Sequence, residues 1–358
     1  MYDVVLLTLS DGRPLPSGCG SGDSCCSAAS DAEACERTEA AAGSTEPDGA
    51  TAGAGSTDRA GGAAVARGDA PRVPVLACAD ALTAAGARVE MVTAHSDAEI
   101  DALLARLDGP TRPDGLTWPD DDSKTRLIVA TASDGQLRAV VRRMVRRYAP
   151  PPSRRPEDLA SNRTLPDLPP VGLLPLDPAG ADGRADLAAQ LGLPRQPDAV
   201  AAAVLAGRTR RLDLLRNDGG SVTLDGALLG GADDTGRPLA WRGRVEVDGV
   251  VLSTGDDPLL ACVVGNAGAY AKVEEVSLLT APDPTDGVVE VAVAVPVTAQ
   301  SRWRRSQVRL EVRRARGRAV AVTPRDGKVP YLDDGVAGEL GRKRSWWVEP
   351  GVWAVYTG

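Results

Sequence analysis

The stretch RLIVATASDGQLRAVVRRM, residues 126–144, decides the fold of this chain. Residues 126–131 form an apolar run typical of a buried strand, and a short polar turn around Asp134 and Gly135 follows. The apolar residues beyond the turn recur at helical spacing on one side of a helix: Leu137, Val140, Val141, Met144, Val145 and Tyr148. A strand, a tight turn and a helix in this order often hold a phosphate, because the first N–H groups of the helix point towards the anion. The stretch therefore predicts an α/β domain with a candidate phosphate-binding turn.

The rest of the N-terminal half repeats this alternation of strands and helices. Residues 2–9, 88–94 and 171–176 are compact apolar runs of strand length, and residues 73–86 and 96–109 have helical composition. Ser96 and Glu99 have the spacing of a capping box at the start of the second helix. Strands that alternate with helices predict a parallel sheet covered on both faces.

Beyond residue 208 the chain changes to short strands separated by Gly and Asp-Gly turns, and the dipeptides at 225–226 and 248–249 favour hairpins. We therefore expect an α/β N-terminal domain with a parallel sheet and a C-terminal antiparallel β-sandwich domain. Residues 1–10 are the expected first strand of the α/β domain, 11–72 a disordered insertion, and 73–207 the α/β nucleotide-binding-like domain. Residues 208–345 are the expected β-sandwich, and 346–358 a C-terminal strand that can return to the first domain.

The segment 11–72 is rich in Gly, Ala, Ser, Thr and Asp, and Leu15 and Val65 are its only large aliphatic residues. Such a segment buries too little apolar surface to offset its ordering entropy, which predicts disorder. It could act as a lid or remain an untethered tail. Four of the six cysteines lie in this segment: Cys19, Cys25, Cys26 and Cys35. They have no paired CxxC spacing, so a metal-binding or redox role is open, and so is the absence of any such role.

The net charge of −8 argues against nonspecific binding to nucleic acid, and a single histidine excludes zinc sites that need two. The absence of a long apolar run and of signal-peptide features predicts a cytoplasmic protein. Peripheral membrane contact is an alternative for residues 300–318, where Trp303 stands among arginines; the same segment could be an edge strand protected by charge. The polar side of the 134–148 helix could bind nucleotide or lipid phosphate or be a solvated face: Arg138, Arg142, Arg143, Arg146 and Arg147.

Five segments, taken in order, resemble the diacylglycerol kinase catalytic-domain family, the lipid-kinase relatives of NAD kinase. Residues 126–141 fall where the family has a strand, a Gly-Gly-Asp-Gly-Thr loop and a helix, and 169–194 resemble its Leu-Gly-Ile-Ile-Pro-Leu-Gly-Thr-Gly-Asn-Asp segment. Residues 208–216 resemble the next strand, and 262–271 with 279–293 resemble its Gly-Asn and Asp-Gly-x-Leu-Asp-Val succession. Residues 329–340 and 348–356 fall where the family reads Asp-Gly-Glu and a Pro-Gly strand.

This resemblance implies transfer of the γ-phosphate of ATP, with Mg²⁺, to a lipid alcohol. Asp334 matches the family's catalytic base, and Asp134 would help to hold the magnesium ion or the phosphates. The remaining matches imply these nucleotide-binding residues: Ser10, Gly12, Ser133, Asp134, Gly135 and Gln136. The oligomeric state does not follow from the resemblance.

Several motif positions depart from the family pattern. Ala132 and Ser133 replace the two glycines of the phosphate loop, Gln136 replaces its Thr, and Val336 replaces the Glu after Asp334 and Gly335. At the second loop, residues 177–178 read Asp-Pro in place of Gly-Thr. Three functions therefore compete: a lipid kinase, a catalytically inactive pseudokinase that binds nucleotide, lipid or a protein, and a structural or regulatory interaction protein.

Overall fold

The computed structural model of the chain describes residues 2–10, 72–120, 122–177, 186–273, 276–299 and 307–358. Apart from Arg72, the predicted insertion lies outside the described residues, and so do Gly12 and Trp303. No helix in the described part is long and apolar enough to cross a membrane.

The N-terminal half contains four parallel strands in the order β2-β1-β3-β4. They are β1 (Asp3–Leu9), β2 (Arg88–Ala94), β3 (Thr125–Thr131) and β4 (Val171–Pro175). The helices between and after them are α1 (Arg72–Ala84), α2 (Asp97–Leu104), α3 (Asp134–Tyr148), α4 (Leu187–Gln190) and α5 (Pro197–Ala206), with 3₁₀ turns at Ala105–Leu107 and Pro152–Arg154. The predicted parallel strands are therefore present.

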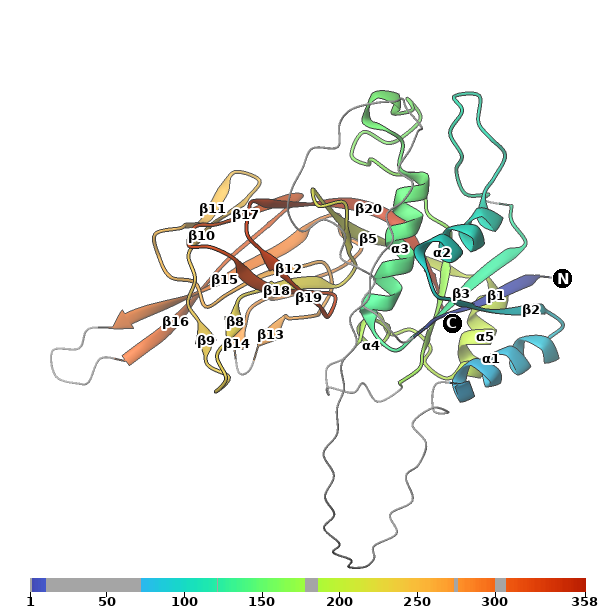
Figure 1. Cartoon of the computed structure of the whole chain (residues 1–358), viewed down its shortest axis with the longest axis horizontal. Helices are drawn as coiled ribbons and strands as arrows, with labels where there is room; N and C mark the ends of the chain where they lie inside the picture. Colours follow the sequence, from blue (N-terminus) through green and yellow to red (C-terminus); the bar gives the residue numbers. More distant parts are fainter. Residues whose placement is uncertain (1, 11–71, 121, 178–185, 274–275, 300–306) are drawn as a thin grey trace, which may run out of the picture. The chain divides into compact units, whose positions relative to one another are not determined.

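Alternate residues of β1 and β3 point to opposite faces of the sheet, as the two-residue period of a strand requires. Val5, Leu7 and Leu127 pack against α2 and α3 on one face. Val4 and Leu6 pack against α1 and α5 on the other. Figure 1 shows these two pairs of helices on either side of the parallel strands. Both faces are covered, as the alternation of strands and helices predicts.

The helices α2 and α3 follow the sequence signals closely. Ser96 accepts a hydrogen bond from the Glu99 N–H, and Glu99 in turn accepts one from the His95 N–H. All six residues of the predicted stripe on α3 are buried. Its arginines, apart from the exposed Arg146, are only partly exposed and bind carboxylates, so the expectation of a solvated face is wrong for four of the five.

The C-terminal half consists of antiparallel strands. Its longer strands are β5 (Thr209–Asn217), β7 (Gly226–Leu229), β10 (Gly243–Val247), β11 (Val250–Thr254), β12 (Ala261–Gly265), β15 (Val289–Ala299), β16 (Gln307–Gly317), β17 (Ala319–Pro324), β18 (Val329–Asp333), β19 (Val336–Leu340) and β20 (Arg344–Tyr356). The two-residue strands are β6 (Val222–Thr223), β8 (Gly231–Ala232), β9 (Pro238–Leu239), β13 (Lys272–Val273) and β14 (Val276–Ser277). Six of them form the sheet β16-β15-β12-β7-β18-β19.

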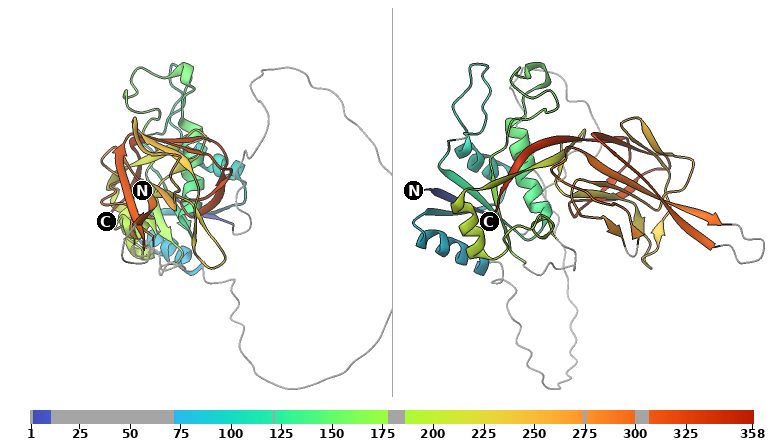
Figure 2. Two further views of the ribbon diagram at one scale, coloured as in Figure 1. Left: turned by 90° about the vertical axis from the view of Figure 1, so that its left-hand side faces the viewer. Right: turned by 180° about the vertical axis from the view of Figure 1, so that it is seen from behind.

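The parallel strands are not a separate sheet. They continue through β20 into one ten-stranded mixed sheet, β11-β10-β17-β20-β4-β3-β1-β2, from which β5 and β6 branch. β20 pairs antiparallel with β17 and β5 and parallel with β4, where Val355 stands opposite Val171. Figure 2 shows β20 as the long red strand that reaches the parallel strands. The expectation of an all-parallel N-terminal sheet is therefore replaced by a mixed sheet, because a strand of thirteen residues is long enough to pair in both halves.

A bulge near Gly351 allows β20 to change partners. The register against β5 shifts between Glu349 and Trp353, and Gly351 has a φ of 59°, which glycine adopts without strain. The Asp213 carboxylate accepts a hydrogen bond from the Gly351 N–H at 2.7 Å. Side chains of the mixed sheet and of the six-stranded sheet form one hydrophobic core, which includes the buried Trp346.

The two Asp-Gly dipeptides behave differently. Asp248 and Gly249 have positive φ angles and join β10 to β11 in a two-residue hairpin, as predicted. Asp225 and Gly226 do not form a hairpin: β6 pairs with β5, whereas β7 pairs with β12 and β18. The hairpin prediction at 225–226 is wrong because tertiary pairing separates the two strands that flank the dipeptide.

Candidate functional site

The candidate phosphate-binding turn connects β3 to α3 and contains Ala132 and Ser133. Ser133 is the N-cap of α3 with a φ of −156°, which is extended backbone open to any residue. The loss of a glycine at this position therefore causes no strain. The Ala132 N–H donates to Oε1 of Gln136 at 2.7 Å, so a side chain of the helix's own first turn occupies this backbone donor.

Gly135 follows at the start of α3, where the next hairpin comes very close. A Cβ on Gly135 would lie 2.6 Å from Cγ2 of Val336 and 3.5 Å from the Asp334 carbonyl oxygen. The first distance is far below van der Waals contact, so only glycine fits here unless Val336 moves. The close packing of the β18–β19 hairpin thus explains why residue 135 is a glycine, and a bound phosphate is not needed to account for it.

Asp134 is the first residue of α3 and is partly buried. Both of its carboxylate oxygens lie 3.2 Å from the Leu187 N–H at the start of α4. Burial raises the pKa of Asp134 to about 6; the hydrogen bond from Leu187 opposes this shift, and the charges of Asp334 and Asp186 add to it. Asp134 therefore connects the first turns of two helices.

Asp334 lies in the two-residue turn between β18 and β19, where Asp334 and Gly335 have φ angles of 48° and 78°. Its side chain is fully buried. The carboxylate accepts hydrogen bonds from three successive backbone N–H groups, at 2.8, 2.9 and 3.2 Å: those of Leu224, Asp225 and Gly226. Burial raises the pKa of Asp334, whereas the charge of Arg138 and these three donors oppose the rise. The carboxylate therefore holds the β6–β7 connection in place.

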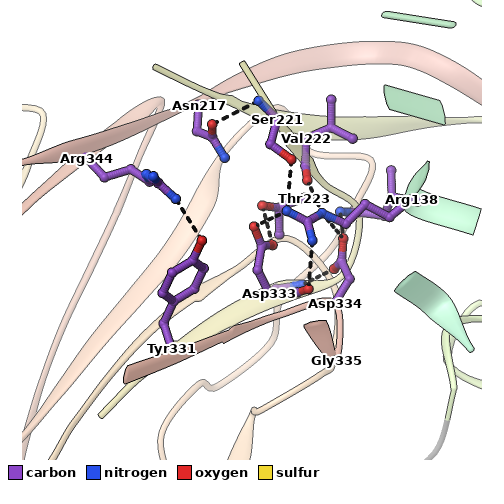
Figure 3. A network of polar contacts seen from close by, with 12 residues as sticks. Arg138, Asn217, Ser221, Val222, Thr223, Tyr331, Asp333, Asp334, Gly335 and Arg344 are labelled. Carbon is purple, nitrogen blue, oxygen red and sulfur yellow. Dashed lines mark hydrogen bonds and ion pairs between the residues drawn. The ribbon is translucent and has the colours of Figure 1, made fainter. Parts of the chain in front are cut away.

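Arg138 crosses from α3 to the same hairpin and forms the centre of the polar contacts in Figure 3. Its Nη2 lies 2.7 Å from Oδ2 of Asp333, and its Nε lies 3.8 Å from Oδ2 of Asp334. Nε also donates to the Val222 carbonyl at 2.7 Å, and Nη2 donates to Oγ of Ser221 at 2.8 Å. The Arg138 side chain is 12% exposed and that of Asp333 only 1%. This is a buried ion pair between α3 and the β-rich half.

Two further buried carboxylates belong to this group. Asp333 accepts a hydrogen bond from Oγ1 of Thr223, and burial raises its pKa to about 7 against the opposing charge of Arg138. Asp225 accepts from the Ala269 N–H and from Nε2 of Gln190, and burial raises its pKa to about 8. The Arg138 guanidinium thus lies among several carboxyl groups that are largely excluded from water.

The structure brings most of the predicted site residues together. Ser133, Asp134, Gly135 and Gln136 form the first turn of α3, and the turn containing Asp334 packs against Gly135. Ser10 is exposed just after β1, where its N–H donates to the Ala94 carbonyl. Gly12 lies outside the described residues.

Three residues of this site were not predicted from the sequence: Asp225, Asp333 and Thr223. Arg138 was predicted as a phosphate ligand or a solvated residue, and its ion pair with Asp333 was not foreseen. The Asp-Gly dipeptide at 225–226 was interpreted as a turn signal alone, whereas Asp334 of the dipeptide at 334–335 was predicted as the catalytic base. The useful signal was that each places an acidic residue beside a predicted strand, although nothing in the sequence shows that the two dipeptides meet.

The comparisons with known proteins agree with this architecture. No family model and no curated protein matches the sequence. Three solved structures from Bacillus anthracis str. Sterne are similar, one described as a diacylglycerol kinase and two provisionally assigned to that activity. They have TM-scores of 0.52–0.53 and 11% identity, and the alignments cover 80% of this chain and 91–92% of theirs. The chain has a diacylglycerol kinase-like fold. At this identity, the likeness concerns the fold alone.

Two backbone donors beside the turn that opens α3 are bound within the protein. The Ala132 N–H is bound by Gln136 and the Leu187 N–H by Asp134, so these backbone donors are already satisfied. Asp134 was predicted as a metal ligand. In the described ranges, no three His, Cys, Asp or Glu side chains are grouped to hold a metal ion.

Proposed function

We propose that this chain is a catalytically inactive member of the lipid-kinase fold, a pseudokinase whose remaining role is to bind a lipid or a protein rather than ATP. The proposal rests on the environment of Asp334, the residue that matches the catalytic base expected from the resemblance. Its carboxylate is fully buried and accepts three backbone hydrogen bonds. A general base must come within hydrogen-bonding distance of the hydroxyl that it deprotonates. Asp334 could reach a lipid hydroxyl only if the β6–β7 connection gave up these bonds.

The start of α3 supports the same proposal. Phosphoryl transfer depends mainly on positioning and on neutralising the charge of the phosphates. Gln136 takes the Ala132 donor, and Val336 occupies the space beside Gly135. A triphosphate would have to displace these contacts and would also face several carboxylates with a single buried arginine among them.

An active lipid kinase is the second candidate, because Asp134 keeps a partly exposed carboxylate at a helix N-terminus. Burial raises its pKa to about 6 and so disfavours the ionised form, which a bound cation would favour. Activity in this case requires a rearrangement of the Gln136 side chain and of the hairpin at Asp334.

The test combines binding and turnover. Calorimetry with ATP and magnesium is expected to give no heat at millimolar nucleotide, and diacylglycerol in mixed micelles is expected to gain no labelled phosphate. The proposal fails if ATP binds in the micromolar range and Asp134→Ala abolishes the binding.

It also fails if labelled phosphatidic acid forms and Asp334→Asn stops the reaction. Asp326→Asn is the matched control, because Asp326 is a well-exposed acidic residue 3.9 Å from Arg242. Transfer that is lost in the Asp334 variant and retained in this control would assign activity to the buried carboxylate.

A further inference from the structure

A second group of arginines lies near the other end of α3. Arg146 stands twelve residues after Asp134, which corresponds to about 18 Å along the helix axis. A cavity of about 490 Å³ opens beside it. Its walls are the last turns of α3, residues 115–117, Pro151, and the side chains of Asp101 and Asp108. This cavity shares no residue with the site at the start of the helix.

Two of the three arginines that line the cavity are held in place by carboxylates. Nε of Arg143 donates to Oδ1 of Asp101 at 2.7 Å. Nε of Arg147 donates to Oδ1 of Asp108 at 2.6 Å, and the Tyr148 hydroxyl donates to the same oxygen at 3.1 Å. These contacts fix the guanidinium groups at the cavity wall. They also neutralise two of the positive charges.

The third arginine is not neutralised. Arg146 is exposed and, within the described ranges, makes no ion pair, hydrogen bond or ring contact. The lining therefore carries three guanidinium groups against two carboxylates. The negative end of the α3 dipole favours cations in the last helical turn, which accounts for the presence of arginines there. It does not account for the cavity that they line.

The other residues that line the cavity are suited to contact the uncharged part of a ligand. Leu116, Ala149 and Pro151 supply apolar surface, and the Thr117 hydroxyl has no hydrogen-bond partner among the described residues. A volume of this size lies within the range of about 300–1,000 Å³ that is usual for small-molecule sites. It is far larger than an inorganic phosphate ion requires.

We propose that this cavity binds a phosphate monoester, either a free metabolite or the headgroup of a lipid. Arg146 holds the phosphate, because a guanidinium matches two phosphate oxygens and a dianion gains more from it than a carboxylate does. The Thr117 hydroxyl adds a neutral hydrogen bond, and the body of the ligand packs on Leu116 and Pro151. The site is independent of the proposed loss of phosphoryl transfer.

The test is calorimetry on the full chain with glycerol 3-phosphate and with a short-chain phosphatidic acid below its micelle concentration. Glycerol and inorganic phosphate are the reference probes. Arg146→Gln removes the unpaired charge, and Thr117→Trp fills the cavity without changing charge. Arg88→Gln is the matched control, because Arg88 is an exposed arginine on β2, 3.7 Å from Asp3. Circular dichroism checks that each variant is folded.

At least one of the two monoesters is expected to bind. Arg146→Gln is expected to raise its dissociation constant by about tenfold or more, as for the loss of one charge-assisted hydrogen bond. Thr117→Trp should also weaken binding, whereas Arg88→Gln should not. Binding of glycerol 3-phosphate identifies a soluble ligand, and binding of the phosphatidic acid alone identifies a lipid headgroup. The proposal is overturned if neither monoester binds at millimolar concentration, if Arg146→Gln binds as the wild type does, or if inorganic phosphate binds equally tightly.

Discussion

Replacing Arg138 with Met should destabilise the protein strongly, and the loss should grow with pH. The substitution removes the cation that lies 2.7 Å from Asp333 and 3.8 Å from Asp334 and leaves both carboxylates buried. Removing one partner of a buried ion pair costs about 3–5 kcal/mol of unfolding free energy, because the other charge remains without compensation. The lost bonds to Ser221 and Val222 act in the same direction.

The pH dependence follows from the pKa of Asp333, which burial raises to about 7 even with Arg138 present. Without the guanidinium this pKa rises further. At pH 5.5 the Asp333 carboxyl is protonated in both proteins, so the cost of the substitution should be smaller than at pH 8, where Arg138 favours ionisation of Asp333 in the wild type alone. Each pH unit over which the two proteins differ by one bound proton corresponds to about 1.4 kcal/mol. Because they differ at Asp333 only above pH 7, the cost at pH 8 should exceed that at pH 5.5 by about 1.4 kcal/mol.

Urea unfolding of wild type and Arg138→Met at the two pH values measures this effect. Arg138→Met combined with Asp333→Asn should cost less at pH 8 than Arg138→Met alone, because the pair shares one interaction. Arg88→Met is the control and should change the unfolding free energy by less than about 1 kcal/mol, since its ion pair is exposed. A cost below about 1 kcal/mol for Arg138→Met, or a cost independent of pH, would refute the reasoning, because it would place Arg138 in the same class as a surface arginine.

Three further predictions concern stability. Burial raises the pKa of Asp225 to about 8, so the folded state holds a proton that the unfolded state releases near pH 4. The unfolding free energy should therefore fall as the pH rises from about 4 to about 8. Asp225→Asn should reduce this fall in a series of urea titrations at different pH values. Gly135→Ala should cost about 1–3 kcal/mol through its contact with Val336, and Val336→Ala in the same chain should recover most of the loss; an unchanged melting temperature in Gly135→Ala would contradict this. Gly249→Ala should cost about 1 kcal/mol because Gly249 has a φ of 85°, and a thermal melt that shows stabilisation would disprove the turn geometry.

Features that depend on residues close in the chain could be predicted from the sequence. The strand at 125–131, the turn and the helix at 134–148 follow from the spacing of apolar residues, and Ser96 and Glu99 cap their helix because both lie within one turn. The likeness to the diacylglycerol kinase fold could be inferred in the same way, since five weak matches in order reflect the succession of elements. The type and order of most elements are therefore determined by the sequence alone.

Features that depend on distant partners were decided only by the tertiary structure. Arg138 could have been a solvated residue or a phosphate ligand; its role was decided by Asp333, which lies 195 positions further along the chain. Gly135 resembled part of a phosphate loop, and only the packing of Val336 shows a steric reason for it. The burial of Asp334 depends on donors about 110 positions away, in the β6–β7 connection. Periodicity shows which face of an element is buried, but the partners of that face depend on how the whole chain packs, and those partners decide whether a carboxylate can act as a base.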